Sequence, residues 1–167
     1  MQHFAALTRA EIRDTFKAFC DKRPVGGKFA HRATDIPAGS SPSMKWVNPP
    51  VAYMLHAGVP LMLQAGLDFP GLYAGDTQRV ALEAYPGWLA RQLIGSRSYK
   101  SDDKAKQTPE RLIARKDILH GMVSGQAGAT LYLRPAQHDA LAQDASGDKL
   151  DAVLCMVQAA LAHQRHV

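Results

Sequence analysis

Cysteine is scarce in this sequence, which limits the chemistry that thiols could perform. Only Cys20 and Cys155 occur among the 167 residues, and they are far apart. Two distant cysteines form neither a disulfide framework nor a zinc motif with paired ligands. The seven histidines also lack the spacing of a zinc protease motif. Each cysteine lies in an apolar helical context, so we expect two buried thiols.

Long apolar runs are missing as well. None approaches the ~20 residues that a helix needs to cross a bilayer. The first residues of the chain carry acidic side chains where a signal peptide would have its apolar stretch. We therefore expect a cytoplasmic protein without a membrane partner.

A strong excess of one charge is also lacking. The chain has 20 Lys and Arg against 15 Asp and Glu, a formal net charge of +5. This balance permits a nucleic-acid partner, but it does not make a dedicated basic binding stripe.

The composition itself is that of a soluble globular protein, with 46% hydrophobic and 21% charged residues. The length suits one compact core. We expect a single domain over residues 1–167, with a helix-rich α/β fold and a small sheet.

In the N-terminal part, the sequence predicts helices separated by a long loop. A capping box at Thr8 and Glu11 begins a helix over 8–22. A stretch rich in Pro, Gly and Ser follows, which predicts a loop. Segment 50–67 is apolar and contains Pro60, so we expect either two short helices or one helix kinked at the proline. This segment should be mostly buried.

The C-terminal part is predicted to hold the sheet and four more helices. Segment 78–85 lies between a Gly-Asp pair and a Pro-Gly pair, which indicates a strand, and 129–133 is a candidate second strand. The helices are expected from Pro86 to Gly95, from Pro109, from Pro135 through Leu141, and from about Gly147.

Three carboxylates occupy positions that a metal site would use. Glu83 falls in the predicted strand, and Asp148 and Asp151 lie one turn apart at the start of the last helix. Mg²⁺ and Mn²⁺ prefer such oxygen ligands. The two aspartates would serve equally well as a helix cap and a partner of the helix dipole, and Glu83 as an exposed strand residue. On residue type alone, the sequence favours this second interpretation.

Five segments, in this order, resemble a known family. They are HRATD (31–35), LEAYPGWLARQL (82–93), SYK (98–100), RLIARKDIL (111–119) and SGDKLDAVLCMVQAALA (146–162). With their E-x-Y-P and GD-x-LDA motifs, they resemble the domain-of-unknown-function 429 family, which is classed as predicted ribonuclease H-like nucleases. The resemblance spans most of the chain. It implies a partial ribonuclease H-like fold with a packed C-terminal helix.

The resemblance also implies a metal-dependent nuclease site for nucleic-acid phosphodiesters. In the ribonuclease H-like fold, acidic residues from central strands and from the last helix converge on one or two divalent ions. By resemblance, Glu83 and Asp151, with Asp148 beside it, would be catalytic and would hold Mg or Mn. The other matching positions are candidates for substrate binding: Arg32, Asp35, Tyr99, Lys100 and Arg111.

One family feature has no counterpart in this sequence. Family members carry a strand with an Asp in a G-x-D pattern and then a D-x-P-x-G motif, both of which would precede residue 1. We therefore expect the chain to resemble the C-terminal two-thirds of the domain, with an incomplete carboxylate site and little or no nuclease activity. The alternative is a non-catalytic remnant or a self-associating interaction module. Without the family's first strands, strand 78–85 would have an unpaired edge, so we expect a homodimer across it.

Overall fold

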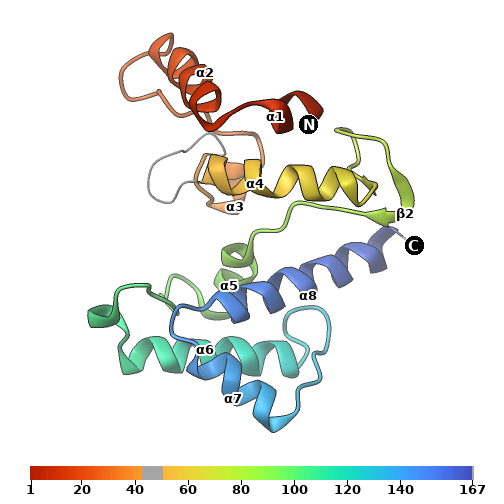
Figure 1. The fold of residues 1–167 in the computed structure, drawn as a ribbon. Coiled ribbons are helices and arrows are strands. Elements are labelled where there is room, and N and C mark those ends of the chain that lie inside the picture. Colours follow the sequence, from red (N-terminus) through yellow and green to blue (C-terminus); the bar gives the residue numbers. More distant parts are fainter. Residues whose placement is uncertain (43–50, 167) are drawn as a thin grey trace. The chain divides into compact units, whose positions relative to one another are not determined.

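The computed structural model describes residues 1–42 and 51–166. The chain divides into two compact units, the N-terminal unit Met1–Glu83 and the C-terminal unit Ala84–Val167, and we describe each by itself (Figure 1). The prediction of one domain over 1–167 stays a prediction. Part of the predicted loop, residues 43–50, lies outside the described residues.

The N-terminal unit begins with helices α1 (Gln2–Ala6) and α2 (Arg9–Asp21). The capping box predicted for α2 is present. The backbone N–H of Glu11 donates to Oγ1 of Thr8 at 3.2 Å, and the backbone N–H of Thr8 donates to Oε2 of Glu11 at 2.7 Å. These two bonds satisfy orphan donors at the helix start, and the predicted helix is confirmed.

A short helix and a long helix follow. Helix α3 (Asp35–Ala38) interrupts the predicted loop. Helix α4 (Val51–Gln64) continues through Pro60. Of the two predicted alternatives for this segment, one helix or two short helices, the structure therefore contains one helix. Only two residues of α4 are buried, and several of its large apolar side chains are exposed. The prediction of a mostly buried segment is wrong, because α4 is apolar around its circumference and the described residues cover only part of it.

The sheet contains two parallel strands, β1 (Leu67–Asp68) and β2 (Asp76–Val80). The strand predicted over 78–85 therefore begins earlier and ends at Val80. Asp68 pairs with Val80, and the carbonyl of Asp68 accepts the N–H of Ala81 at 2.8 Å. Since β1 ends at Asp68, the residues after Ala81 pair with no further strand residue within the described ranges. Glu83 consequently lies beyond the strand.

Four helices build the C-terminal unit: α5 (Pro86–Ile94), α6 (Pro109–Val123), α7 (Pro135–Gln143) and α8 (Asp148–His166), with a 3-10 turn at Lys104–Lys106. All four agree with the sequence predictions. Helix α5 packs against α6 and α8, and α7 also packs against both (Figure 1). The fully buried side chains at the centre are Leu89, Ile118, Leu119, Met122, Leu150 and Leu154.

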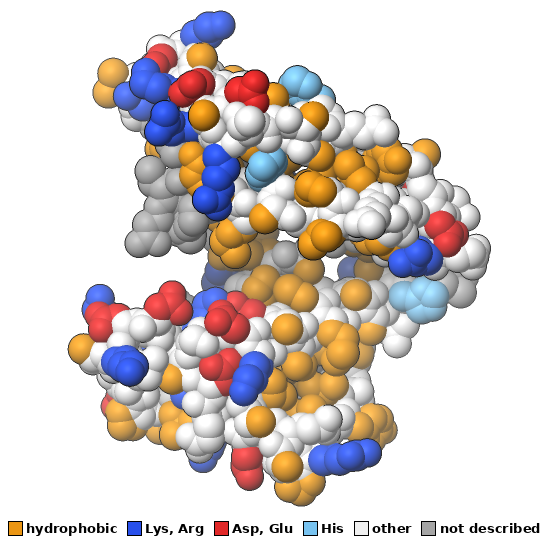
Figure 2. Space-filling view, in the orientation of Figure 1, with side chains coloured by type: hydrophobic (Ala, Val, Ile, Leu, Met, Phe, Trp, Pro, Cys, Tyr) orange, Lys and Arg blue, Asp and Glu red, His pale blue; other side chains and the backbone are white. Residues whose placement is uncertain are grey.

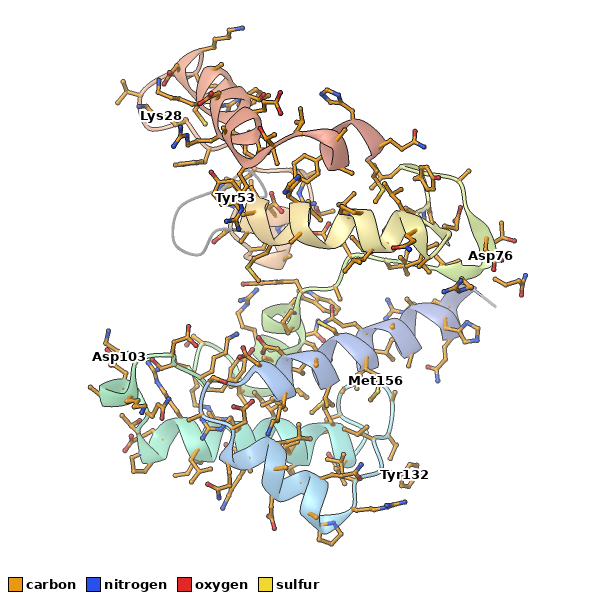
Figure 3. The ribbon with its side chains drawn as sticks, in the orientation of Figure 1. Lys28, Tyr53, Asp76, Asp103, Tyr132 and Met156 are labelled. Atoms are coloured by element: carbon orange, nitrogen blue, oxygen red, sulfur yellow. The ribbon has the colours of Figure 1, made fainter. Side chains whose placement is uncertain are left out.

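Residues 129–133 form no strand, so that candidate was wrong. The N–H of Leu131 donates to the carbonyl of Met122 at the end of α6, at 3.0 Å. Leu131 and Leu133 pack against the core, whereas Tyr132 between them is 88% exposed and projects from the connection (Figure 3). A connection over a helical core can thus alternate apolar and exposed residues like a strand without belonging to a sheet.

The described residues form a helix-rich protein of mixed α/β class with a small parallel sheet. The ribonuclease H-like fold stays a prediction. Cys20 is buried as expected, while Cys155 is only partly buried. Within the described ranges, no helix has the length and apolarity of a membrane span.

Candidate functional site

The predicted site residues fall into two clusters, one in each unit. The Asp151 cluster, in the C-terminal unit, contains Tyr99, Lys100, Arg111 and Asp151, with Asp148 nearby in sequence. The Arg32 cluster, in the N-terminal unit, contains Arg32, Asp35, Ser40 and Glu83. Acidic and basic side chains are mixed over the face seen in Figure 2, without a broad patch of one sign.

Asp151 is the centre of the first cluster. Its carboxylate lies in the first turn of α8 and is 18% exposed. The phenol Oη of Tyr99 donates to Oδ1 at 2.6 Å, and Nζ of Lys100 pairs with Oδ2. Each carboxylate oxygen therefore has its own donor, one neutral and one cationic.

Two arginines on α6 hold the backbone of the loop that carries Tyr99 and Lys100. Nη1 of Arg111 donates to the carbonyl of Lys100, and Nη1 of Arg115 donates to the carbonyl of Tyr99, both at 2.7 Å. Nε of Arg115 also donates to the carbonyl of Ala142 at 2.7 Å. The two arginines lie on one face of α6 because they are four residues apart.

The sequence did not single out Arg115, although it lies in the same segment, 111–119, as Arg111. Its side chain is buried, and burial lowers the pKa of its guanidinium, while the charge of Asp144 acts in the opposite direction. A buried arginine that bonds two carbonyls from different segments fixes them relative to each other. The spacing of four from Arg111 was the available signal.

The start of α8 is shaped by Gly147 and Asp144. Gly147 has a φ of +76°, and a Cβ there would lie 2.7 Å from Cβ of Lys100. Only glycine suits both the left-handed backbone and this close approach. Oδ2 of Asp144 accepts the backbone N–H of Lys149 at 2.9 Å, so Asp144 caps the first turn.

Asp148 was a candidate for that cap. In the structure its Oδ2 accepts a hydrogen bond from Oγ of Ser146 at 3.3 Å. The same hydroxyl lies closer to Oδ1 of Asp144, at 2.8 Å, so the two aspartates share its single proton. Burial on its own would raise the pKa of Asp144, but the bonds from Lys149 and Ser146 outweigh it and hold that pKa below its usual value.

Tyr99 and Cys155 both lie near the Asp151 carboxylate and keep their protons at neutral pH. Burial raises the pKa of the Tyr99 phenol, and the hydrogen bond to the Asp151 carboxylate raises it further. Burial and then the charge of Asp151 likewise raise the pKa of the Cys155 thiol, one turn along α8. Tyr99 is therefore a permanent hydrogen-bond donor here, and Cys155 is no thiolate nucleophile.

The E-x-Y-P motif is held by a residue that sequence reasoning also missed. The side-chain amide of Gln158 on α8 accepts the N–H of Tyr85 at 3.2 Å and donates to the carbonyl of Tyr85 at 3.0 Å. This pair of bonds fixes the backbone just before α5. Through these bonds the backbone of Tyr85 is attached to α8.

The Arg32 cluster is built around a bidentate ion pair. Nη1 and Nη2 of Arg32 donate to Oε2 and Oε1 of Glu83, both at 2.7 Å. Nη2 also donates to Oδ1 of Asp35 at 2.7 Å, and the backbone N–H of Arg32 donates to Oδ2 at 2.7 Å. Asp35 is 1% exposed, whereas the Glu83 side chain is 67% exposed.

Arg32 sets the protonation of this cluster. Its hydrogen bonds lower the pKa of Asp35 to about 2, against the effect of burial, which would raise it. Glu83 first and Asp35 second raise the pKa of the Arg32 guanidinium. Both interactions favour the charged forms.

The predicted metal ligands thus have donors from the protein itself. In the part of the chain that the structure describes, no group of three or more His, Cys, Asp or Glu is placed to hold a metal ion. Glu83 pairs with Arg32 in one unit, and Asp151 pairs with Lys100 in the other. The hard carboxylate oxygens suit Mg²⁺ or Mn²⁺ in type, and the metal site stays a prediction.

Comparisons with family models, with curated proteins and with solved structures gave no match to this chain. The class of protein rests on the fold and the two clusters: a helix-rich α/β protein in which Glu83 is paired with Arg32 and Asp151 with Lys100, while Asp148 accepts from Ser146. The resemblance to the domain-of-unknown-function 429 family stays a prediction.

Proposed function

We propose that this chain is a metal-dependent, ribonuclease H-like nuclease of low activity, which acts on nucleic-acid phosphodiesters through the Asp151 cluster. One observation carries the proposal. A carboxylate in the first turn of a long helix is bonded by a phenol and a lysine whose loop is held by a partly exposed arginine. The two free thiols support a cytoplasmic location.

Each residue of the cluster has a role in the proposed chemistry. Asp151 and Asp148 would hold Mg²⁺ or Mn²⁺, which would supply an activated water and stabilise negative charge on the phosphate. Tyr99 keeps Oδ1 of Asp151 oriented by its hydrogen bond. Lys100, once released from Oδ2, would neutralise a phosphate oxygen, and Arg111 would add guanidinium donors beside it.

The same contacts account for low activity. A cation at Asp151 competes with Nζ of Lys100, because both are positively charged and both bind the same carboxylate. A bound ion would therefore be repelled by the Lys100 ammonium as long as that ion pair persists. Glu83 is similarly occupied by Arg32 in the N-terminal unit.

Metal binding is tested most directly by Mn²⁺ titration followed by electron paramagnetic resonance. Lys100→Gln removes the competitor, so we expect it to bind Mn²⁺ several-fold more tightly than the unaltered chain. Asp151→Asn should abolish this binding, and Lys116→Gln, an exposed lysine on α6, should leave it unchanged. Failure of both the unaltered chain and Lys100→Gln to bind Mn²⁺ would refute the metal site.

Hydrolysis of labelled single-stranded and double-stranded DNA and RNA, with millimolar Mg²⁺ or Mn²⁺, tests the activity itself. We expect slow cleavage at most, lost in Asp151→Asn. Rapid cleavage that depends on Asp151 would contradict the low activity, and cleavage that survives the substitution would remove Asp151 from the mechanism.

A second candidate is a self-associating interaction module, which the sheet favours. Every residue of β2 is exposed, and among the described residues β1 is the only strand that pairs with it. A second copy could pair with the other edge of β2 and form a homodimer. Sedimentation at micromolar concentration tests this: we expect a dimer, and a monomer would count against it.

A further inference from the structure

We propose that Arg32 is a binding site for a phosphate group, and that Glu83 of the same chain occupies this site and competes with the ligand. The inference concerns the N-terminal unit and does not depend on the nuclease proposal. It rests on the geometry of the ion pair, on the burial of Asp35 and on the exposure of Glu83.

The guanidinium of Arg32 is held in place from one side. Asp35, buried at 1% exposure, accepts hydrogen bonds from Arg32 and also from Oγ of Ser40 at 3.1 Å. The backbone N–H of Ser40 closes the turn by donating to the carbonyl of Asp35 at 2.9 Å. The charge of Arg32 is thus oriented before any ligand arrives, which reduces the entropy lost on binding.

Glu83 occupies the other side of the guanidinium as a ligand would. Its two oxygens accept from Nη1 and Nη2 at equal distances of 2.7 Å. Arginine binds carboxylate and phosphate with the same paired geometry, because both present two oxygens to the planar fork. A phosphate can therefore replace the Glu83 carboxylate oxygen for oxygen.

Glu83 is also easy to displace. It lies beyond the end of β2, its side chain is 67% exposed, and the structure records no other hydrogen bond for it among the described residues. Asp35, in contrast, is buried, and its displacement from Arg32 would break its hydrogen bonds with both Arg32 and Ser40. A phosphate carries more negative charge than a carboxylate, which favours it in the exchange.

The size of the competition follows from the exposure of the pair. Exposed ion pairs are weak, so removing Glu83 should tighten phosphate binding by at most about fivefold. A larger effect would require a buried pair, which Glu83 does not form.

Titration of the full chain with inorganic phosphate, without metal and followed by calorimetry, tests the proposal. We expect Glu83→Gln to bind phosphate up to about fivefold more tightly than the unaltered chain. Asp14→Asn, which removes an exposed negative charge from the same unit, is the matched control for net charge and should have little effect. Equal affinities of the Glu83 and Asp14 variants would overturn the proposal.

Two variants of Arg32 complete the experiment. Combined with Glu83→Gln, Arg32→Gln should abolish phosphate binding. Arg32→Lys keeps the charge but loses the paired donors, so it should weaken binding strongly while preserving more of the fold, which circular dichroism would check. Phosphate binding unchanged in the folded Arg32→Lys variant would refute the site. Acetate in place of phosphate should bind more weakly, and equal binding would contradict the choice of ligand.

Discussion

Asp35 should make a measurable contribution to stability that disappears in acid. Its pKa is about 2 in the folded chain against a reference value of 3.8. A shift of this size corresponds to at most ~2.4 kcal/mol of unfolding free energy. Arg32, the partner that causes it, is 43% exposed, so solvent weakens the attraction and we expect about 1 to 2 kcal/mol.

The sign follows from the lowered pKa. Above about pH 5 both the folded and the unfolded Asp35 are ionised, and the full contribution is present. As the pH falls toward 2, Asp35 becomes protonated in the unfolded chain while it stays ionised in the folded chain. The free energy of unfolding therefore decreases progressively. Below about pH 2 the contribution is lost.

Asp35→Asn isolates this effect from the other carboxyl groups. Urea unfolding of both proteins, followed by circular dichroism, should show the variant about 1 to 2 kcal/mol less stable at pH 7. The difference between the two should shrink as the pH falls from 5 to 2, because Asn does not titrate. A difference that stays constant over this range would mean that Asp35 acts through packing or neutral hydrogen bonds, which would refute the electrostatic argument.

Three further predictions concern the C-terminal unit. Tyr99→Phe removes the hydrogen bond to Asp151 and should lower the free energy of unfolding in urea by about 1.5 to 3 kcal/mol. In the unaltered protein, titration followed at 295 nm should show that the Tyr99 phenol has a raised pKa, and this signal should be missing from the variant. Gly147→Ala should destabilise by more than Gly71→Ala, because both glycines have a φ of +76° but only at Gly147 would the new Cβ meet another side chain. Equal melting temperatures would contradict this. Arg115→Gln leaves two buried carbonyls without their donor and should cost about 2 to 4 kcal/mol, a loss that thermal unfolding would detect.

Helix boundaries were predictable because the signals are local. The capping box of α2, the prolines at the first positions of α5, α6 and α7, and Gly95 after α5 each act within a single turn. A residue that satisfies an orphan N–H, or that fixes φ, needs no distant partner. These elements therefore formed where the sequence placed them.

Strands were predicted poorly because a strand depends on its neighbour. Segment 78–85 has a suitable pattern, but β2 ends at Val80 because its partner β1 supplies only two residues. Segment 129–133 has the alternation of a strand and becomes a connection, since the N–H of Leu131 donates to the carbonyl of Met122 at the end of α6 and not to a neighbouring strand. Pairing is a long-range property that a single segment does not encode.

The fold divides the candidate residues into two clusters, whereas the family resemblance implied a single site. The motif order suggested one site with Glu83 and Asp151 together, while the contacts recorded for these residues lie within separate units. The sequence does not show which residue pairs with each carboxylate. Arg32 lies 51 positions from Glu83, and Tyr99 lies 52 positions from Asp151, so no local pattern links them.

The two aspartates at the start of α8 show how the alternatives separate. A cap needs a side-chain oxygen that accepts a backbone N–H of the first turn, and Asp144 performs this task by accepting from Lys149. Asp148 and Asp151 are therefore not required to begin the helix through such a bond. Asp151 still benefits from the helix dipole, but its oxygens are engaged by Tyr99 and Lys100 rather than by the backbone. The helix start does not need the Asp151 carboxylate, and a lysine already neutralises it, so a cation could bind there in place of Lys100. The Mn²⁺ titration of Lys100→Gln therefore decides whether Asp151 is a metal ligand or only a residue of the helix start.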